Sequence, residues 1–145
     1  MNLKLKYRKA SESDLDFLLN LRMKTMNEHY ANSSLPTDRE STLQRVLYQF
    51  EKANIILFNN EPIGLLKIDR SKDKIEVLQL QVDPSQQGKG LGKMILKEII
   101  AEALSSQKPV VLSVLKTNKA QNLYSSLGFV TIDKNEHSYI MECQQ

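Results

Sequence analysis

A strand, a glycine-rich turn and a long amphipathic helix follow one another in the middle of the chain. Residues 74–82 carry the alternating apolar pattern of a strand, and glycines follow at positions 88, 90 and 92. Beyond the turn, apolar or small residues recur with the period of a helix that packs on a sheet. They are Gly92, Ile95, Leu96, Ile99, Ile100 and Ala103. Residues 110–114 are wholly apolar, which predicts a central strand. Such a strand–helix–strand unit is expected to cross over right-handed and to place its two strands parallel.

The remaining patterns predict an α/β fold with a mixed (α+β) sheet. Helices are expected at residues 13–27, 42–50 and 120–127, and further strands at 3–7, 55–58, 63–68, 129–132 and 138–141. Residues 28–41 are polar, contain a proline and are predicted to form a loop. The 145 residues contain no repeat or linker, so we expect one domain over residues 1–145.

Charge and composition argue against several classes of function. There are 20 basic and 17 acidic residues, so the net charge is +3. That excess is too small to indicate nucleic acid, but it is compatible with an anionic small molecule at a local basic patch. No apolar run approaches the ~18 residues of a membrane span. With Cys143 as the one cysteine, no intrachain disulfide can form. We therefore expect a cytoplasmic protein that binds neither nucleic acid nor membrane.

The glycine-rich turn has the composition of a phosphate site. Glycine lets the backbone approach a ligand, and the first turn of a helix offers unpaired N–H groups and a favourable dipole. Lys89, Lys93 and Lys97 lead away from the turn along the helix. Neither of two better-known phosphate motifs fits: the Walker loop fails at Gln87 and Met94, and the dinucleotide fingerprint fails at Lys93.

The strand before this turn changes phase. Its apolar residues fall on odd positions up to Val77 and on even positions from Leu78 to Val82. Because side chains alternate with period two, the slip predicts either burial on both faces or a β-bulge. A bulge frees backbone N–H groups, which could point at the carbonyl oxygen of a ligand.

Two segments together resemble the GNAT superfamily of acyl-CoA N-acyltransferases. The first is Gln87-Gly88-Lys89-Gly90-Leu91-Gly92 after a strand that ends in Leu80-Gln81-Val82. The second, Asn118 to Phe129, is similar to the family's Asn-x-x-Ala-x-x-Leu-Tyr-x-x-x-Gly-Phe run. The sharp resemblance covers roughly residues 75–130.

This resemblance implies that acetyl-CoA is the co-substrate. Leu80 and Val82, with Gln81 between them, would offer backbone groups to the pantetheine arm, and the strand would splay from its neighbour at residues 110–114. Asn118 would lie on the cofactor side, and Tyr124 would face the departing sulfur as its acid. The diphosphate would be held by Gln87, Gly88, Lys89, Gly90, Leu91, Gly92 and Lys93.

The general base has several candidates. Glu76 lies on the strand before the bulge, where several family members carry a glutamate, but it could equally be a solvent-facing charge beside Lys74. Water is a third route for the proton of the amine. His29, Tyr30 and His137 could rim the acceptor pocket. With Cys143, the two histidines are too scattered for a metal site, so none is expected.

The acceptor is left open by the sequence. Residues 20–45 and the last strands are where GNAT-like proteins bind it, and Glu28, Asp38, Glu40 and Glu136 could attract a cationic amine. Amino acid, polyamine, aminoglycoside, peptide N-terminus and protein lysine all remain candidates. A non-catalytic acyl-CoA sensor is the alternative function, and a nucleotide- or nucleic-acid-binding protein is a more distant one. The last strand pair could be shared in a homodimer.

Overall fold

The computed structural model describes residues 5–25, 35, 37–86 and 88–144. The strands are β1 (Leu5–Lys9), β2 (Ala53–Phe58), β3 (Glu61–Arg70), β4 (Ile75–Val82), β5 (Val110–Leu115), β6 (Val130–Lys134) and β7 (Ser138–Cys143). The helices are α1 (Leu15–Thr25), α3 (Arg39–Leu47), α4 (Leu91–Ser105) and α5 (Gln121–Ser126). Short 3-10 turns occur at Glu12–Asp14, Phe50–Lys52 and Pro84–Gln86.

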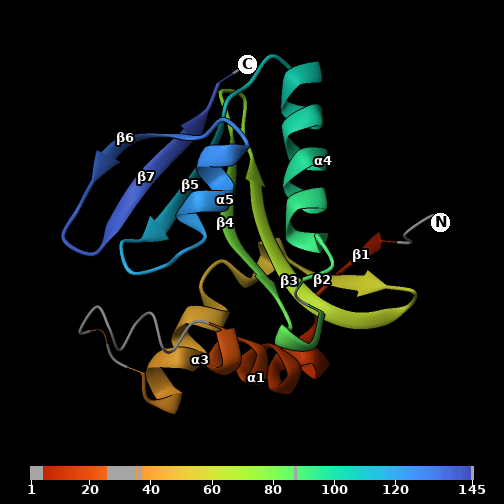
Figure 1. Cartoon of the computed structure of the whole chain (residues 1–145). Helices are drawn as coiled ribbons and strands as arrows, with labels where there is room; N and C mark the ends of the chain where they lie inside the picture. Colours follow the sequence, from red (N-terminus) through yellow and green to blue (C-terminus); the bar gives the residue numbers. More distant parts are fainter. Residues whose placement is uncertain (1–4, 26–34, 36, 87, 145) are drawn as a thin grey trace.

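The strands form one mixed sheet in the order β1-β2-β3-β4-β5-β7-β6 (Figure 1). Neighbours are antiparallel except β4 and β5, which are parallel. The helix α4 forms the crossover between these two strands, so the predicted fold class and the predicted parallel pair are both confirmed.

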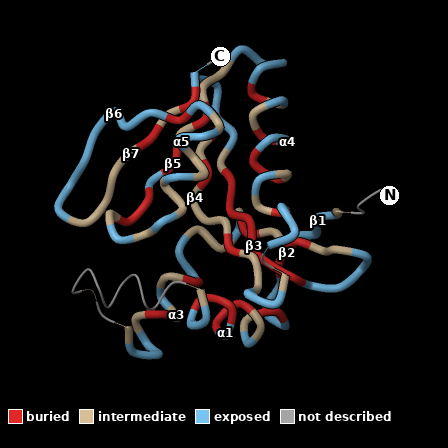
Figure 2. Tube along the Cα trace, in the orientation of Figure 1, coloured by how far each residue is buried: buried red, intermediate tan, exposed pale blue. Residues whose placement is uncertain are grey.

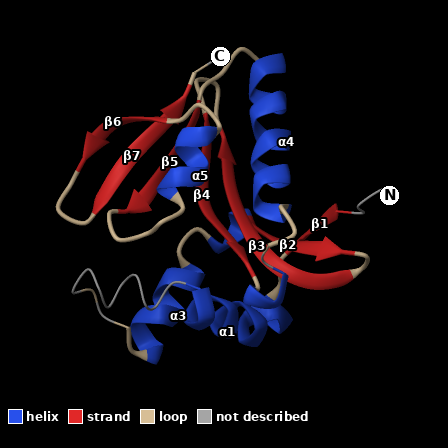
Figure 3. Ribbon diagram, viewed as in Figure 1, coloured by secondary structure: helices blue, strands red, loops and turns tan. Residues whose placement is uncertain are grey.

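Helices cover both faces of the sheet (Figure 3). One core lies between the sheet and α4, whose residues Leu91, Ile95, Leu96 and Ile99 are buried. A second core gathers Leu18, Leu19 and Leu21 of α1 and Val46 of α3 against β2 and β3. The buried stretches of β2, β3 and β4 run between these two cores, whereas β6 is exposed along its length (Figure 2). No helix among the described residues is long and apolar enough to cross a membrane.

Two helix boundaries differ from the prediction because aspartate side chains set them. The helix expected from residue 13 opens as a 3-10 turn, in which the Asp14 carboxylate accepts the Ser11 N–H at 2.9 Å. The helix expected at residues 42–50 begins at Arg39, since Asp38 caps it by accepting the Ser41 N–H at 3.1 Å. It ends at Leu47, and Gln49 adopts a left-handed backbone with φ of 48°.

The phase slip had two possible explanations, burial on both faces or a β-bulge, and the structure has a β-bulge in β4. Lys67 of β3 pairs with Gln79 and the next residue, Ile68, pairs with Val77, so Leu78 is the extra residue. Toward β5, the parallel ladder runs only from Ile75 to Val77. Beyond the bulge β4 and β5 are no longer paired, as the family resemblance implied.

Candidate active site

Two cavities meet where β4 and β5 separate. A groove of about 540 Å³ lies between the end of β4, the start of α4 and α5. A cavity of about 290 Å³ lies between the separated halves of β4 and β5 and reaches α1 and α3. Leu80 and Tyr124 line both. The two cavities are therefore adjacent at these residues, one beside α4 and the other reaching α1 and α3.

The glycine-rich turn forms one end of the groove. Gly88 and Gly90 have φ of +84° and +74°, backbone angles that side-chain-bearing residues rarely adopt, and Gly90 is the N-cap of α4. No side chain of the described residues caps this helix start, so the N–H groups of its first turn can bind an anion. Gly92, Leu91 and Lys93 also line the groove. Gln87 lies outside the described residues.

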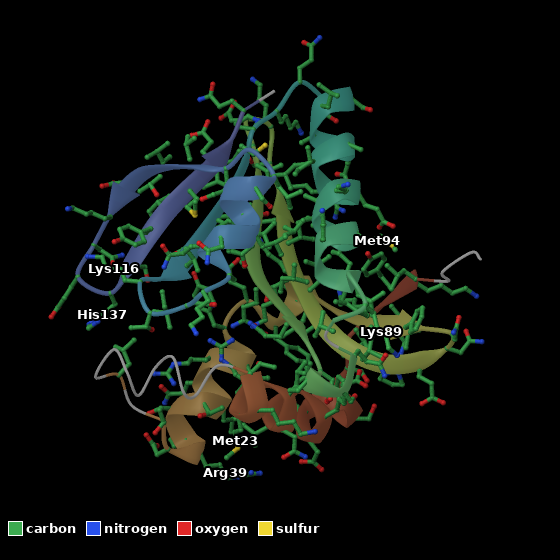
Figure 4. All side chains as sticks on the ribbon, viewed as in Figure 1. Met23, Arg39, Lys89, Met94, Lys116 and His137 are labelled. Atoms are coloured by element: carbon green, nitrogen blue, oxygen red, sulfur yellow. The ribbon has the colours of Figure 1, made fainter. Side chains whose placement is uncertain are left out.

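The three lysines of this region have different surroundings. Lys89 donates to Gln86 Oε1 at 2.8 Å, and its Nζ lies 5.8 Å from the centre of the Phe58 ring. Figure 4 shows it at the foot of α4, beside the hairpin of β2 and β3. Lys93 lines the groove, and both Lys93 and Lys97 line a second depression along α4. Of these three lysines, Lys93 is the one that lines the groove.

The end of β4 carries side chains on both faces of the sheet. After the bulge, Leu80 and Val82 pack against the core beneath α4. Gln81 is turned to the opposite face, where its side chain lines the smaller cavity and is only 6% exposed. A methyl group on Gly64 would lie 2.3 Å from the Gln81 carbonyl oxygen, so a glycine at this position lets β3 pack closely against the site.

Tyr124 is held at the junction by the turn that precedes α5. Asn118 lines the smaller cavity and accepts the Ala120 N–H at 2.9 Å through Oδ1. Gln121 Nε2 donates to the carbonyls of Lys116 and Asn118. The Tyr124 ring packs 5.9 Å from the Phe129 ring, and burial raises the pKa of its hydroxyl. The phenol is thus kept in the protonated form that an acid needs.

Comparison with known proteins agrees with this geometry. Residues 25–139 match the family described as the acetyltransferase (GNAT) domain. The chain belongs to the GNAT acetyltransferases.

Individual relatives are distant. The [ribosomal protein bS18]-alanine N-acetyltransferase of Haemophilus influenzae is 27% identical over 85 residues, and this match covers 58% of each protein. The PaiA N-acetyltransferase of Thermoplasma acidophilum, solved with coenzyme A, is 22% identical with a TM-score of 0.75 and covers 98% of this chain and 99% of that one. The Escherichia coli ribosomal-protein-S18-alanine N-acetyltransferase is 19% identical with a TM-score of 0.68, covering 97% and 94%. These structures support the GNAT fold.

Glu76 of this GNAT protein lies among surface charges. Its carboxylate is 3.9 Å from Lys74 Nζ, and it pairs in register with Asp69 of β3. It is not among the residues that line either cavity. These contacts fit the second alternative given for Glu76, a solvent-facing charge beside Lys74.

The other candidate polar residues that the structure describes line neither cavity. His29 and Tyr30 are outside the described residues. His137 lies 3.7 Å from the exposed Glu136 carboxylate, in the turn between β6 and β7 and next to Lys116 (Figure 4). Cys143 is buried, its thiol donates to the Leu127 carbonyl at 3.8 Å, and burial raises its pKa. Among the described residues, no group of three or more potential metal ligands occurs.

Sequence reasoning missed the polar residues of the smaller cavity. Arg22 of α1, Arg45 of α3 and Gln79 of β4 line it together with Gln81. Arg22 is 3% exposed although it is charged. The signal was present in the sequence, because Arg22 follows Leu18, Leu19 and Leu21 on the side of α1 that is buried. In contrast, Asp38 caps α3, and neither Glu40 nor Glu136 lines the cavity.

Proposed function

We propose that this protein transfers an acetyl group from acetyl-CoA to a primary amine, which attacks the thioester directly. The observation that carries the proposal is the meeting of the two cavities at Leu80 and Tyr124, between strands that have separated. One substrate can enter from the α4 side and the other from the side of α1 and α3. Direct transfer then requires no covalent enzyme intermediate.

The residues of the groove fit acetyl-CoA. The uncapped N-terminus of α4 and the open space at Gly88 and Gly90 suit a diphosphate, and Lys93 adds a cation beside them. Between Leu78 and Gln81, the edge of β4 that faces β5 has no strand partner among the described residues, so it can pair with the amides of a pantetheine arm. When bound, acetyl-CoA supplies the activated acyl carbonyl and a thiolate leaving group.

Two groups of the chain would serve the reaction itself. Leu78 lines the smaller cavity and has no ladder partner on β3, so we assign the bulge N–H groups to the oxyanion. Tyr124 would donate its phenolic proton to the departing thiolate. We propose that the proton of the amine leaves through water, since Glu76 pairs with Lys74 and lines neither cavity. Glu76→Gln tests the remaining alternative, in which this carboxylate is the base.

Thermal unfolding with acetyl-CoA, coenzyme A, ATP and NAD tests the cofactor site. A ligand that binds only the folded state at a hundred times its Kd adds ~2.7 kcal/mol of stability. Stabilisation by acetyl-CoA and coenzyme A alone, followed by thiol release with an amine, is the expected result. Binding without release for any amine would instead favour the acyl-CoA sensor. Stabilisation by ATP alone would refute both.

We also propose a cytoplasmic location and a homodimer. The single buried cysteine is compatible with the cytoplasmic location expected from the sequence. On the edge strand β6, Val130 is 59% exposed and Ile132 is 52% exposed. An exposed apolar edge of this kind could pair with a second copy, so we propose a homodimer through β6. Sedimentation of the purified protein distinguishes monomer from dimer.

A further inference from the structure

The smaller cavity has a positive lining. Arg22 and Arg45 reach it from the helical layer of α1 and α3, and none of the described residues that line it is acidic. The other lining residues are apolar, hydroxyl or amide groups. A polycationic acceptor would enter against two guanidinium charges, whereas an anionic group would be attracted by them.

A third cation lies behind this lining. Lys67 of β3 is 0% exposed, and its Nζ donates to the carbonyls of Arg45 and Val46 at 3.1 and 2.8 Å. Burial and the charge of Arg22 lower its pKa to about 8, so it remains largely protonated at neutral pH. These bonds also fix the end of α3, which carries Arg45.

Amide oxygens complete the polar surface. The Oε1 atoms of Gln79 and Gln81 are buried and accept no hydrogen bond within the described part of the chain. A buried acceptor without a donor is costly, so both atoms suit the N–H groups of a bound amine. Unlike carboxylates, these neutral groups do little to hold the amine as an ammonium ion.

We propose that the acceptor is a small amine that carries an oxyanion, a carboxylate or a phosphate, on the same molecule. Arg22 and Arg45 bind the oxyanion, since guanidinium matches its two oxygens, while Gln79 and Gln81 accept from the amine. This inference rests on the proposed function and names its substrate class. The volume of about 290 Å³ is at the lower end for ligand pockets and suits a small molecule.

The same lining bears on the missing base. Cations near a bound amine disfavour its charged form and lower its pKa. More of the amine is then neutral at pH 7, where it can attack, and its proton can pass to water. A site without a carboxylate base is therefore consistent with amine transfer.

Matched acceptor pairs test the proposal. Lysine and cadaverine differ by one carboxylate, and phosphoethanolamine and ethanolamine by one phosphate. With acetyl-CoA, we expect the anionic member of at least one pair to show kcat/KM at least tenfold higher, and the pair that responds identifies the anion. Equal or faster acetylation of the members that lack the anion, or of peptide N-termini without acidic residues, would overturn the proposal.

Substitutions of the two arginines test whether the smaller cavity causes the preference for anionic acceptors. Arg45→Gln and Arg22→Met should each raise KM for the anionic acceptor about tenfold or more, with stabilisation by acetyl-CoA retained. Arg39→Gln is the matched control, because Arg39 is exposed on the same helix as Arg45, at the lower edge of the molecule (Figure 4). An unchanged KM in Arg45→Gln and Arg22→Met would remove these side chains from the site. Unfolding midpoints identify any variant that merely fails to fold.

A binding measurement separates this inference from the proposed function. Calorimetry with the acetylated products requires no turnover, and it compares N-acetyl-amino acids with their amides and N-acetyl-phosphoethanolamine with N-acetylethanolamine. Tighter binding of the anionic product, lost in Arg45→Gln but kept in Arg39→Gln, supports the oxyanion site even if no acceptor is acetylated. Equal binding of both products, or binding of neither, refutes the site. Absence of any stabilisation by acetyl-CoA would refute the proposed function alone.

Discussion

Leu80 on β4 and Tyr124 on α5 line both the groove beside α4 and the cavity that reaches α1 and α3. The two residues come from elements more than forty positions apart, and the β-bulge at Leu78 turns Leu80 toward this junction. A reaction between two substrates that enter from opposite sides would occur here. Of these two residues, Tyr124 is the one with an ionisable side chain.

Replacing Tyr124 by phenylalanine should separate catalysis from binding. The ring and its packing on Phe129 are kept, while the proton donor is lost, so kcat should fall by ~10²-fold or more. Stabilisation by acetyl-CoA should not change. Tyr139→Phe is the control, because Tyr139 contacts Lys116 and lines neither cavity. The rate of thiol release gives kcat for both variants. An unchanged kcat in Tyr124→Phe would exclude the tyrosine from the mechanism.

The pH profile provides a second test of the same residue. Burial raises the pKa of Tyr124 above the usual value, which is near ~10 for a phenol. The acid form therefore persists throughout the neutral and mildly alkaline range, and kcat should show no loss from this group below pH ~10. A falling limb near pH 8 that disappears in Tyr124→Phe would contradict this assignment.

The positive φ of Gly90 should matter for the binding of coenzyme A as well as for the stability of the fold. Alanine at a positive φ costs ~1–2 kcal/mol in a left-handed backbone. Gly128, with φ of +102°, provides a matched control outside both cavities. We expect Gly90→Ala and Gly128→Ala to lower the free energy of unfolding similarly, but only Gly90→Ala to weaken binding of coenzyme A. Calorimetric titration of both variants measures this, and equal affinities would argue against a phosphate site at the turn.

The elements around the candidate site could be predicted where residues close in sequence determine them. The glycine turn, the helix α4 and the phase slip at Leu78 are set by residues close in sequence, through backbone freedom and side-chain periodicity. The position of Tyr124 in a short helix stopped by Gly128 was recognisable for the same reason. These elements appear in the structure within a few residues of the predicted bounds.

The smaller cavity could not be predicted in this way. Arg22, Arg45 and Gln81 come from α1, α3 and β4 and meet only because those helices pack across the opened sheet. Lys67 is another example, since a lysine within the apolar run of β3 has no local partner and finds its acceptors more than twenty positions away, at Arg45 and Val46. Only tertiary packing reveals such a convergence.

The ion pair of Arg8 and Asp14 should make stability fall in acid. Two bonds of 2.9 Å join the side chains, and Arg8 holds the pKa of Asp14 at about 2, below the ~3.9 of an unfolded aspartate. Since the folded-state pKa is the lower one, the stabilisation is complete above pH ~5 and is lost as pH falls from ~4 to ~2. Because Arg8 is partly exposed, we expect a loss of about 1–2 kcal/mol.

Urea unfolding at pH 5 and pH 2.5 measures this loss in the wild type and in Asp14→Asn. The asparagine cannot titrate, so its unfolding free energy should depend less on pH by about the same amount. Asp16→Asn is the control, since Asp16 lies in the next helical turn and forms no ion pair among the described residues. Equal pH dependence in the wild type and Asp14→Asn would show that the pair contributes nothing to acid sensitivity.

Lys67 should affect both stability and the acceptor. In Lys67→Met the buried carbonyls of Arg45, Val46 and Tyr48 lose their donor, and each unsatisfied group costs ~1–3 kcal/mol. Removing the desolvated charge offsets part of this cost, so we expect the unfolding free energy to fall by about 2–4 kcal/mol.

The end of α3, which carries Arg45, also loses its anchor in this variant, so KM for the acceptor should rise while stabilisation by acetyl-CoA persists. Lys52→Met is the control, since Lys52 pairs with Asp69 at the surface at 2.8 Å, and the loss of an exposed ion pair should change the free energy of unfolding much less. Chemical unfolding and acceptor kinetics on both variants make the comparison. If Lys67→Met kept its KM but lost stability, Lys67 would support the fold without positioning Arg45, and the orientation of that arginine would depend on other contacts of α3.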